Sequence, residues 1–317
     1  MEKRALIYHT DLAEDALPDT KDVLDEVKYV SDGLTSLGYE VIQLPFKFNN
    51  EGYEENLTYI QGETSEINPN FIFNLVEEAK GPDGVLTDRL AYLATEVFED
   101  LRIPYTGCTL NAFLRTQTKI EAKRLFIVNG IPTPDFFTLE NLEQFLIKPN
   151  NENASKGIDG KVYSGKNFFA EEYIEGREFN VSCMGPLKDC NVLPIPEMKF
   201  IDWPEDKPKI VGYDAKWNPN SEEYKRTKRS FEISDSDREL MDNLRDITKK
   251  CWDVFDLRGW ARVDFRVDKN GKPYVLEINA NPGIDPTSGF VWATKEAGIS
   301  WEQVLEKIIR DSCGIVA

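Results

Sequence analysis

The fold of this chain is decided by two stretches, Ala261-Arg262-Val263-Asp264-Phe265 and Val275-Leu276-Glu277-Ile278-Asn279. Both alternate apolar and polar side chains, and Asp268-Lys269-Asn270-Gly271 lies between them as a turn signal. With Asn270 and Gly271 as the central turn residues, the predicted partners are Asp264 and Glu277, Arg262 and Asn279, Phe265 and Leu276, and Val263 and Ile278. The pattern predicts an antiparallel hairpin with one apolar face and one face that groups Arg, Asp, Glu and Asn.

Two carboxylates that face each other across a hairpin repel unless a cation lies between them. Asp264 and Glu277 favour Mg²⁺ as this cation, because Mg²⁺ prefers oxygen ligands from one or two carboxylates, whereas zinc favours His and Cys. Asn279 offers a further oxygen, and Arg262 a fixed positive charge for an anion beside the metal. The alternative interpretation is a solvated hairpin face with a fortuitous ion-pair cluster.

Length and composition are typical of a soluble protein with two or three packed units: 317 residues, 41% hydrophobic, with a mean hydropathy of -0.45. No apolar run is long enough to cross a bilayer, and Met1-Glu2-Lys3-Arg4 leads into a strand-like run rather than a signal peptide, which predicts a cytoplasmic protein. The formal charge of -18 argues against nucleic acid or an anionic membrane as the main partner. The five scattered cysteines are predicted to be free thiols.

The N-terminal part has the rhythm of a small parallel α/β domain. Strands are predicted over residues 4–8, 40–44 and 70–75, with helices over 23–37 and about 84–101. A strand-to-turn transition at 103–107 then places the end of the first domain near residue 112.

The remainder of the chain is predicted to alternate helices and strands. A helix begins at Thr118 and ends at Asn129, and strands over 144–149 and 168–174 flank a polar loop. An amphipathic helix over 236–255 is predicted to begin with a Ser236/Glu239 capping box, and a last helix with a Ser300/Gln303 box.

An ordered set of motifs extends over about residues 70–310: Lys119, Lys148, Ser155-Lys156-Gly157, the run from Glu171 to Glu178, Lys216, Arg262-Val263-Asp264, and the run from Glu277 to Gly283. Together they resemble the ATP-grasp superfamily, and within it the D-alanine-D-alanine ligase branch. The resemblance implies an α/β (α+β) ATP-grasp fold in three parts. These are an N-terminal parallel α/β domain (1–112), a small central subdomain (113–178) and a larger C-terminal subdomain with the Mg²⁺ site (179–317).

The resemblance also implies how ATP is held. Lys119 and Lys148 would neutralise its phosphates, and Ser155 with the backbone near Gly157 would form a lid over them. The ribose hydroxyls would donate to Glu178. The adenine edge would meet the Glu171 side chain and the backbone of Glu172 and Ile174.

The catalytic centre implied by the resemblance lies on the hairpin. Asp264, Glu277 and Asn279 would hold Mg²⁺, for which Mn²⁺ is an acceptable substitute, and Arg262 would stabilise charge on the transferring phosphoryl group and the tetrahedral intermediate. Lys216, in a mobile loop over 212–217, would reach the γ-phosphate. Ser288, followed by Gly289, would hold the carboxylate of an acceptor amino acid.

Three stretches depart from the family pattern. Residues 9–15 stand where the branch has a glycine-rich, glutamate-containing turn that anchors the ammonium group of the first amino acid. Residues 150–154 replace the usual glycine and serine pair of the lid, and Thr118 replaces an aspartate. The nucleotide half of the pattern is retained and the donor-substrate half is altered. The basic cluster over 225–229 has two interpretations, recruitment of an anionic substrate or a solvated basic stretch.

The leading hypothesis is an ATP- and Mg²⁺-dependent carboxylate-amine ligase that forms an acyl phosphate and releases an amide, ADP and phosphate. Its substrates would be a small-molecule carboxylate and amine, and the resemblance implies a homodimer. A small-molecule kinase on the same scaffold is the alternative, since both reactions need the same Mg²⁺ and lysines. A nucleotide-binding module without catalysis is a third interpretation, against which the complete set of charged motif residues argues.

Overall fold

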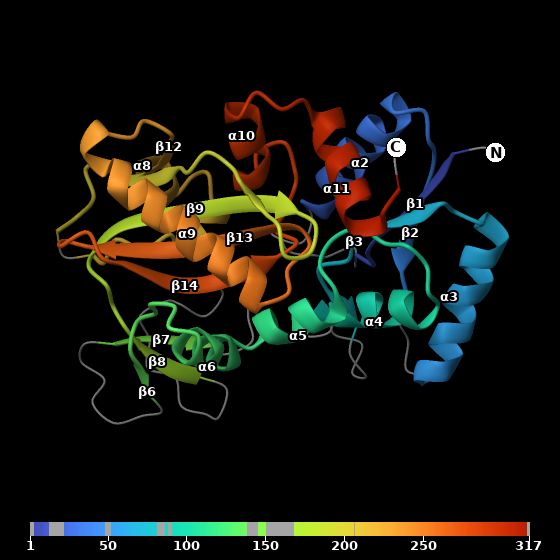
Figure 1. The fold of residues 1–317 in the computed structure, drawn as a ribbon, viewed down its shortest axis with the longest axis horizontal. Coiled ribbons are helices and arrows are strands. Elements are labelled where there is room, and N and C mark those ends of the chain that lie inside the picture. Colours follow the sequence, from blue (N-terminus) through green and yellow to red (C-terminus); the bar gives the residue numbers. More distant parts are fainter. Residues whose placement is uncertain are drawn as a thin grey trace.

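The computed structural model describes residues 3–12, 22–47, 52–80, 86–87, 91–137, 145–149, 168–205 and 207–315. Figure 1 shows the N-terminal sheet and its helices at one end, a large antiparallel sheet at the other and a small sheet beneath the latter. The predicted mixture of a parallel α/β unit and antiparallel sheets is confirmed.

The N-terminal sheet has the order β2-β1-β3, with all strands parallel. Its strands are β1 (Arg4–Thr10), β2 (Glu40–Phe46) and β3 (Phe71–Leu75), as predicted within a few residues. Its helices are α2 (Val23–Ser36), α3 (Tyr53–Ile67) and α4 (Tyr92–Asp100). Helix α3 was not predicted. The helix predicted over 84–101 begins later than expected, because residues 86–87 form strand β5 (Leu86–Thr87), which pairs with β4 (Ala79–Lys80).

Strand β1 is buried on both faces, and its alternating side chains enter two different cores. Ala5 and Ile7 pack in the cluster that contains α2 and the C-terminal helix α11 (Trp301–Cys313). Leu6 and Tyr8 pack in the cluster that contains α3 and α4. The continuous apolar run of β1 therefore follows from its central place in a parallel sheet.

A helical segment joins this unit to a small sheet. It comprises α5 (Leu110–Gln117), which was not predicted, and α6 (Lys119–Val128), which was. The small sheet has the order β6-β8-β7, with β6 (Phe136–Phe137), β7 (Phe145–Pro149) and β8 (Phe168–Glu172). The predicted lid residues Ser155 and Gly157 lie outside the described residues.

The large sheet has β9 (Gly176–Gly185) and β13 (Gly259–Asp268) at its centre, in the order β12-β11-β9-β13-β14. The other strands are β10 (Asn191–Val192), which pairs with β9, β11 (Glu197–Phe200), β12 (Thr227–Ser230) and β14 (Pro273–Ala280). Two short helices, α7 (Tyr213–Trp217) and α8 (Glu222–Arg226), lie between β11 and β12 in sequence.

The β13–β14 hairpin confirms the predicted register at its polar positions, where Asp264 pairs with Glu277 and Arg262 with Asn279. The predicted pairing of Phe265 with Leu276 is wrong. Phe265 pairs with Val275, because a β-bulge shifts the register between Asp264 and Phe265 and leaves Leu276 as the extra residue.

The turn of the hairpin also differs from the prediction. The backbone N–H of Gly271 donates to the carbonyl of Asp268 at 3.0 Å, so Lys269 and Asn270 are the central turn residues and Gly271 follows them with a φ of 81°. The loop therefore has three residues rather than two, which shifts the register by one. The bulge shifts it back before the polar residues are reached.

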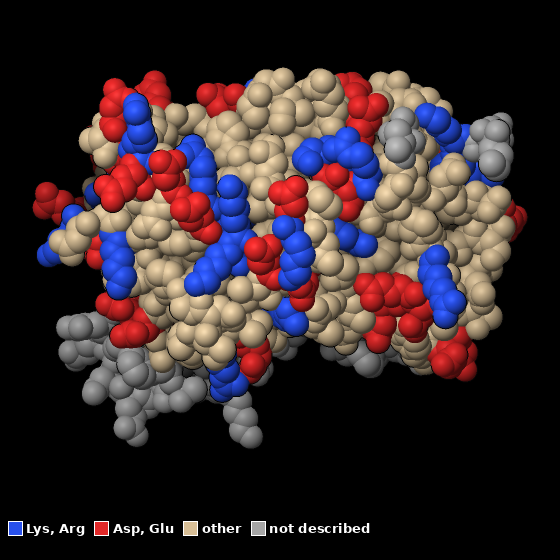
Figure 2. Space-filling model, in the orientation of Figure 1, with Lys and Arg blue, Asp and Glu red and all other residues tan. Residues whose placement is uncertain are grey.

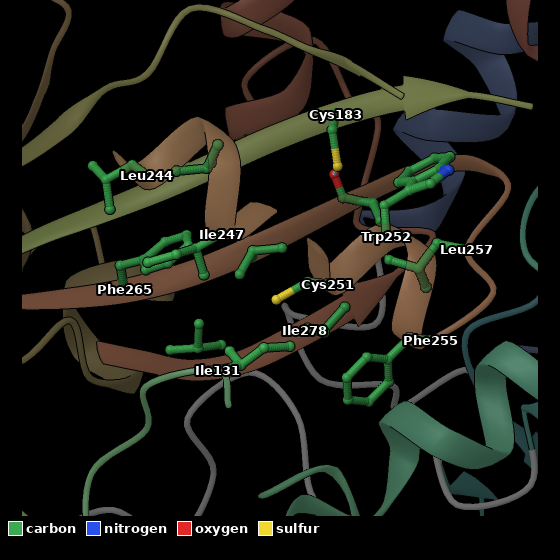
Figure 3. Packing of buried hydrophobic residues seen from close by; sticks show 14 of the residues in the cluster. Ile131, Cys183, Leu244, Ile247, Cys251, Trp252, Phe255, Leu257, Phe265 and Ile278 are labelled. Atoms are coloured by element: carbon green, nitrogen blue, oxygen red, sulfur yellow. Dashed lines mark hydrogen bonds between the residues drawn. The ribbon is translucent and has the colours of Figure 1, made fainter. Parts of the chain in front are cut away.

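Helix α9 (Arg238–Val254) covers one face of the large sheet. Figure 3 shows Leu244, Ile247 and Trp252 of this helix packed with the strand residues Phe265 and Ile278. The predicted Ser236/Glu239 capping box is wrong. A short 3₁₀ turn over Asp235–Asp237 precedes the helix, Asp237 is the N-cap, and the Ser236 hydroxyl bonds to that of Ser234.

The C-terminal helices connect the two ends of the fold. Helix α10 (Gly289–Glu296) follows the hairpin, and α11 then packs beside α2 (Figure 1). At this contact Trp301 stacks on Tyr29 with ring centroids 4.3 Å apart. The predicted Ser300/Gln303 capping box at the start of α11 is present.

Acidic and basic side chains are interspersed on the face drawn in Figure 2. Among the helices that the structure describes, none combines the length and apolar composition needed to cross a membrane. The five cysteines are unpaired thiols, as predicted.

Candidate active site

A cavity of about 1280 Å³ lies on the face of the large sheet opposite α9. Alternation along β9, β13 and β14 separates the two faces. On β9, Phe179, Val181 and Cys183 enter the core, while Glu178 and Asn180 line the cavity. The cavity brings together eleven of the predicted site residues: Lys119, Glu171, Glu172, Ile174, Glu178, Lys216, Arg262, Asp264, Glu277, Asn279 and Ser288. Lys148 is a residue of β7, in the small sheet.

Asp264 accepts hydrogen bonds from three side chains. Arg262 donates through Nε at 2.7 Å and Nη2 at 2.8 Å, Asn180 through Nδ2 at 2.8 Å, and Asn279 through Nδ2 at 3.0 Å. Only 6% of Asp264 is exposed. These donors fix the orientation of the carboxylate in the cavity.

The carboxylate of Glu277, opposite Asp264, forms an ion pair with Lys119 at the start of α6, 3.5 Å away. Lys216 lies near both carboxylates. Burial, followed by the positive charge of Arg262, lowers the pKa of Lys216, while Glu277 and Asp264 oppose that shift. A polyanion that entered this space would favour the charged lysine, so the site is suited to phosphate groups.

Glu178 lies on β9 beside Arg266, which donates to it through Nη1 at 3.3 Å. Burial raises the pKa of Glu178, and Arg266 opposes the shift. Arg266 also donates to the backbone carbonyls of Ile174 (3.0 Å) and Lys209 (2.8 Å). It therefore orders the segment between β8 and β9, which was predicted to meet the adenine edge.

Glu171 and Lys123 form an ion pair of 2.7 Å that is almost completely buried, with 2% and 1% of their side chains exposed. Lys123 also donates to the hydroxyl of Thr133 at 2.9 Å. The pair links α6 to β8. The carboxylate predicted to face adenine is thus held by a lysine one helical turn after Lys119.

Ser288 is the N-cap of α10, and its hydroxyl accepts a hydrogen bond from the backbone N–H of Val291 at 3.3 Å. Arg229 lies at the same place and donates to the carbonyl of Thr287 at 3.4 Å. The basic cluster over 225–229 is therefore divided, since Lys225 and Arg226 pair with Glu222 on the surface while Arg229 lines the cavity. The helix N-terminus and Arg229 together provide a positive potential.

The oxygen donors of Asp264, Glu277 and Asn279 fit a hard divalent cation. The two carboxylates lie opposite each other on adjacent strands, and Asn279 is two residues from Glu277 on the same face. In this structure the side chains of Arg262 and Lys119 supply the positive charge that balances them. Carboxylate and amide oxygens without His or Cys are the donor set that Mg²⁺ prefers.

The family model of the D-Ala D-Ala ligase C-terminus matches residues 147–310, which contain the hairpin, Lys216 and Ser288. This protein belongs to the D-Ala–D-Ala ligase family. The D-alanine–D-alanine ligase of Haemophilus ducreyi is 27% identical to it over 311 residues, which cover 88% of this chain and 89% of the relative.

Solved structures of the family share the ATP-grasp fold of this chain. The D-alanine–D-alanine ligase of Bacillus anthracis complexed with ATP aligns with a TM-score of 0.68 and 20% identity, covering 98% of this chain and 97% of that one. The VanG D-Ala:D-Ser ligase of Enterococcus faecalis aligns with a TM-score of 0.70 and 17% identity, covering 98% and 99%. The predicted fold class is therefore confirmed.

Three residues that shape the site of this D-Ala–D-Ala ligase family member were not predicted: Asn180, Lys123 and Arg266. Arg266 carried a usable signal, because it lies two residues after Asp264 and therefore shares its face of β13. Asn180 and Lys123 carried none, since their partners are 84 and 48 residues away in sequence.

Proposed function

We propose that this protein is an ATP- and Mg²⁺-dependent ligase that joins the carboxylate of one small molecule to the amine of another through an acyl phosphate. Membership of the D-Ala–D-Ala ligase family makes it an ATP-dependent ligase that forms C–N bonds, and favours this reaction over phosphoryl transfer to a hydroxyl. The single observation that carries the assignment is the polar face of the β13–β14 hairpin, where two carboxylates, an arginine and a lysine from α6 converge.

ATP would lie between β8 and the polar face of the large sheet. Lys119 and Lys216, together with Lys148 of β7, would neutralise its phosphates. Glu178 would accept hydrogen bonds from the ribose hydroxyls, and Glu171 and the backbone of Glu172 and Ile174 would meet adenine. The buried contacts of Arg266 and Lys123 support this arrangement because they fix the backbone and carboxylate that would make those bonds.

Asp264, Glu277 and Asn279 would hold Mg²⁺, which supplies charge neutralisation to the ATP phosphates when bound. In the first step a carboxylate oxygen of one substrate attacks the γ-phosphorus, and the bond to ADP breaks. Arg262 would stabilise the charge that develops on the transferring group. Its pKa is raised by Asp264, Glu277 and Glu178 although burial opposes its charge, so it stays protonated throughout.

In the second step the amine of the acceptor attacks the carbonyl carbon of the acyl phosphate. The carbon–oxygen bond to phosphate breaks, the nitrogen loses a proton, and the products are an amide and phosphate. Ser288 and the N-terminus of α10 would position the carboxylate of an amino acid acceptor, beside Arg229. The chain supplies one histidine, so positioning and charge neutralisation account for the catalysis we propose.

The partners follow from the same argument. Both substrates would be small molecules, and the net charge of -18 argues against nucleic acid. We place the enzyme in the cytoplasm, where ATP is available, and expect a homodimer from the resemblance to the family.

The decisive experiment is ADP release with Mg²⁺-ATP against pooled amino acids and small carboxylates, followed by mass spectrometry of each active pool. A new mass equal to acid plus amine minus water, with free phosphate, is expected. A phosphorylated hydroxyl compound would instead support the kinase alternative. Arg262→Ala, which should reduce release by about 100-fold or more, separates this activity from a contaminating ATPase.

A further inference from the structure

The cavity extends past the hairpin to the N-terminal sheet, where carboxylates from three separate segments line its wall. We call this group the acidic subsite. It comprises Asp22 and Glu26 at the start of α2, Glu77 and Glu78 after β3, and Asp285 in the loop after β14. None of these residues belongs to the motifs that the family resemblance assigned to ATP or Mg²⁺.

Glu26 is the most deeply placed member, with 2% of its surface exposed. Its carboxylate accepts a hydrogen bond from the backbone N–H of Ile284 at 2.7 Å. Gly283 leaves room for it, since a Cβ atom at that position would lie 2.8 Å from the Glu26 Oε1. The loop after the hairpin thus holds this carboxylate in one orientation, 258 residues away in sequence.

Glu26 and Glu77 form no ion pair with any lysine or arginine of the described residues. Lys28 also lines the cavity, where it pairs with Asp32 at 2.6 Å. Burial, and then the charges of neighbouring carboxylates, raise the pKa of both glutamates. Glu26 and Glu77 are therefore crowded carboxylates without an ion-pair partner among the described residues, and a cation that bound beside them would favour their ionised forms.

Asn74 is a second and independent sign of a missing ligand. It lines the same cavity at the end of β3, and only 2% of it is exposed. Its Oδ1 accepts from the backbone N–H of Val76 at 3.1 Å, whereas its Nδ2 has no hydrogen-bond partner among the described residues. An unsatisfied buried amide is costly, and a ligand with an acceptor atom would relieve that cost.

The cation that suits this place is an organic ammonium group rather than a metal ion. Among the described residues, no group of three or more His, Cys, Asp or Glu side chains is arranged to hold a metal. One Glu26 oxygen is already occupied by a backbone N–H, which reduces its value as a metal ligand. An ammonium group can donate a hydrogen bond to one carboxylate at a time, and unlike a metal ion it does not need oxygen ligands on every side.

We propose that the acidic subsite binds a substrate that carries two ammonium groups, so that the carboxylate joined by this enzyme is that of a diamino acid. Glu26 and Glu77 receive the ammonium groups, and Asn74 donates to an acceptor atom of the same molecule. The inference rests on the proposed ligase function and specifies its substrate class. Two separate glutamates without cations, supported by Asp285, match a dication better than a single charge.

Three acids of the same length test this proposal: pentanoate, norvaline and 2,4-diaminobutyrate, which carry no, one and two ammonium groups. Binding is measured by calorimetry in the presence of Mg²⁺ and a non-hydrolysable ATP analogue, and ADP release is measured in parallel with Mg²⁺-ATP. We expect 2,4-diaminobutyrate to bind at least about tenfold more tightly than norvaline, since one desolvated charge pair corresponds to about this factor. Equal affinity of these two compounds would overturn the proposal.

Glu77→Gln and Glu26→Gln should each reduce the preference for the diamino acid while leaving the affinity for pentanoate unchanged. Glu239→Gln, on the exposed surface of α9, is the matched control and should retain the preference. If either subsite variant unfolds, Asp285→Asn provides the same comparison. Binding of Mg²⁺ alone that is lost in Glu77→Gln would overturn the proposal in favour of a metal site.

The two readouts separate this proposal from the proposed function. Calorimetric preference without ADP release from any acid and amine would leave the acidic subsite standing and refute the ligase reaction. ADP release that is equally strong with norvaline would support the ligase and refute the subsite.

Discussion

Arg262 donates two hydrogen bonds to Asp264, at 2.7 and 2.8 Å, from two residues earlier on the same strand. One guanidinium group therefore orients a carboxylate of the predicted metal site and places positive charge beside it. A residue that contacts mainly the developing charge should affect turnover more than ATP affinity.

Arg262→Ala should lower kcat by about 100-fold or more with a much smaller change in the KM for ATP. Arg262→Lys keeps the charge but loses the two-pronged geometry, so it should recover only part of the rate. Steady-state ADP release at varied ATP measures both quantities. Equal losses in kcat and in ATP affinity would show that Arg262 contributes to ground-state binding instead.

Removal of divalent metal by a chelator should abolish ADP release, and Mg²⁺ or Mn²⁺ should restore it. Glu277→Gln should raise the Mg²⁺ concentration for half-maximal activity by about tenfold or more, because one of two facing carboxylates is lost. The control Glu239→Gln lies on the opposite side of the large sheet and should show the wild-type Mg²⁺ dependence. An unchanged Mg²⁺ dependence in Glu277→Gln would remove this residue from the metal site.

The sequence predicted the polar pairs of the hairpin correctly, although it predicted neither the true length of the turn nor the bulge that compensates for it. The turn has one residue more than predicted, which by itself would have moved Asp264 away from Glu277. The bulge at Leu276 corrects that shift. Alternation identified which side chains share a face, whereas the bulge depends on how the strand packs and has no local signal.

Long-range features of the site were beyond the reach of sequence patterns. The hydrogen bond from the backbone N–H of Ile284 to the Glu26 carboxylate joins segments 258 residues apart, and no local pattern in either segment predicts this contact. The helix cap at Ser300 was predictable because both members of its box lie within one turn. The capping box at Ser236 was predicted wrongly because the polar run 234–237 contains several possible N-cap residues. Ser234 caps a 3₁₀ turn that precedes the helix.

Ser288→Ala should raise the KM for an amino acid acceptor and also lower the free energy of unfolding by about 1 kcal/mol, because Ser288 caps α10. Ser300→Ala is a control of matched chemistry, since Ser300 caps α11 with the same side chain. It should have a similar effect on stability and none on the acceptor KM. If both variants change KM equally, the effect of Ser288 is structural.

The stability of the fold should fall as the pH rises through the window set by Glu26. Burial, followed by the charge of Asp22, raises the pKa of Glu26 to about 8 from its usual 4.5. Between these values the native state binds more protons than the unfolded state, so raising the pH lowers the free energy of unfolding, by on the order of 1 kcal/mol per pH unit. Urea unfolding at pH 5, 6.5 and 8 measures this slope.

Glu26→Gln should flatten that slope by about one proton, because glutamine does not titrate. Relative to the wild-type protein, Glu26→Gln should therefore raise the free energy of unfolding more at pH 8 than at pH 5. Glu239→Gln, which is exposed, should leave the slope unchanged. A slope that is the same in Glu26→Gln and in the native protein would show that Glu26 titrates normally.

Leu244 of α9 is completely buried against the back of the strands that carry Asp264 and Glu277. Leu244→Ala should lower the free energy of unfolding by about 2–5 kcal/mol, through lost transfer energy and the cavity that remains (Figure 3). Leu187→Ala removes the same atoms from a side chain that is 49% exposed and should cost less than about 1 kcal/mol. Denaturant unfolding of both variants tests the difference. Because the core lies on the opposite face of the sheet from the cavity, folded Leu244→Ala should retain the wild-type KM for ATP, and a raised KM would mean that helix packing sets the position of Asp264 and Glu277.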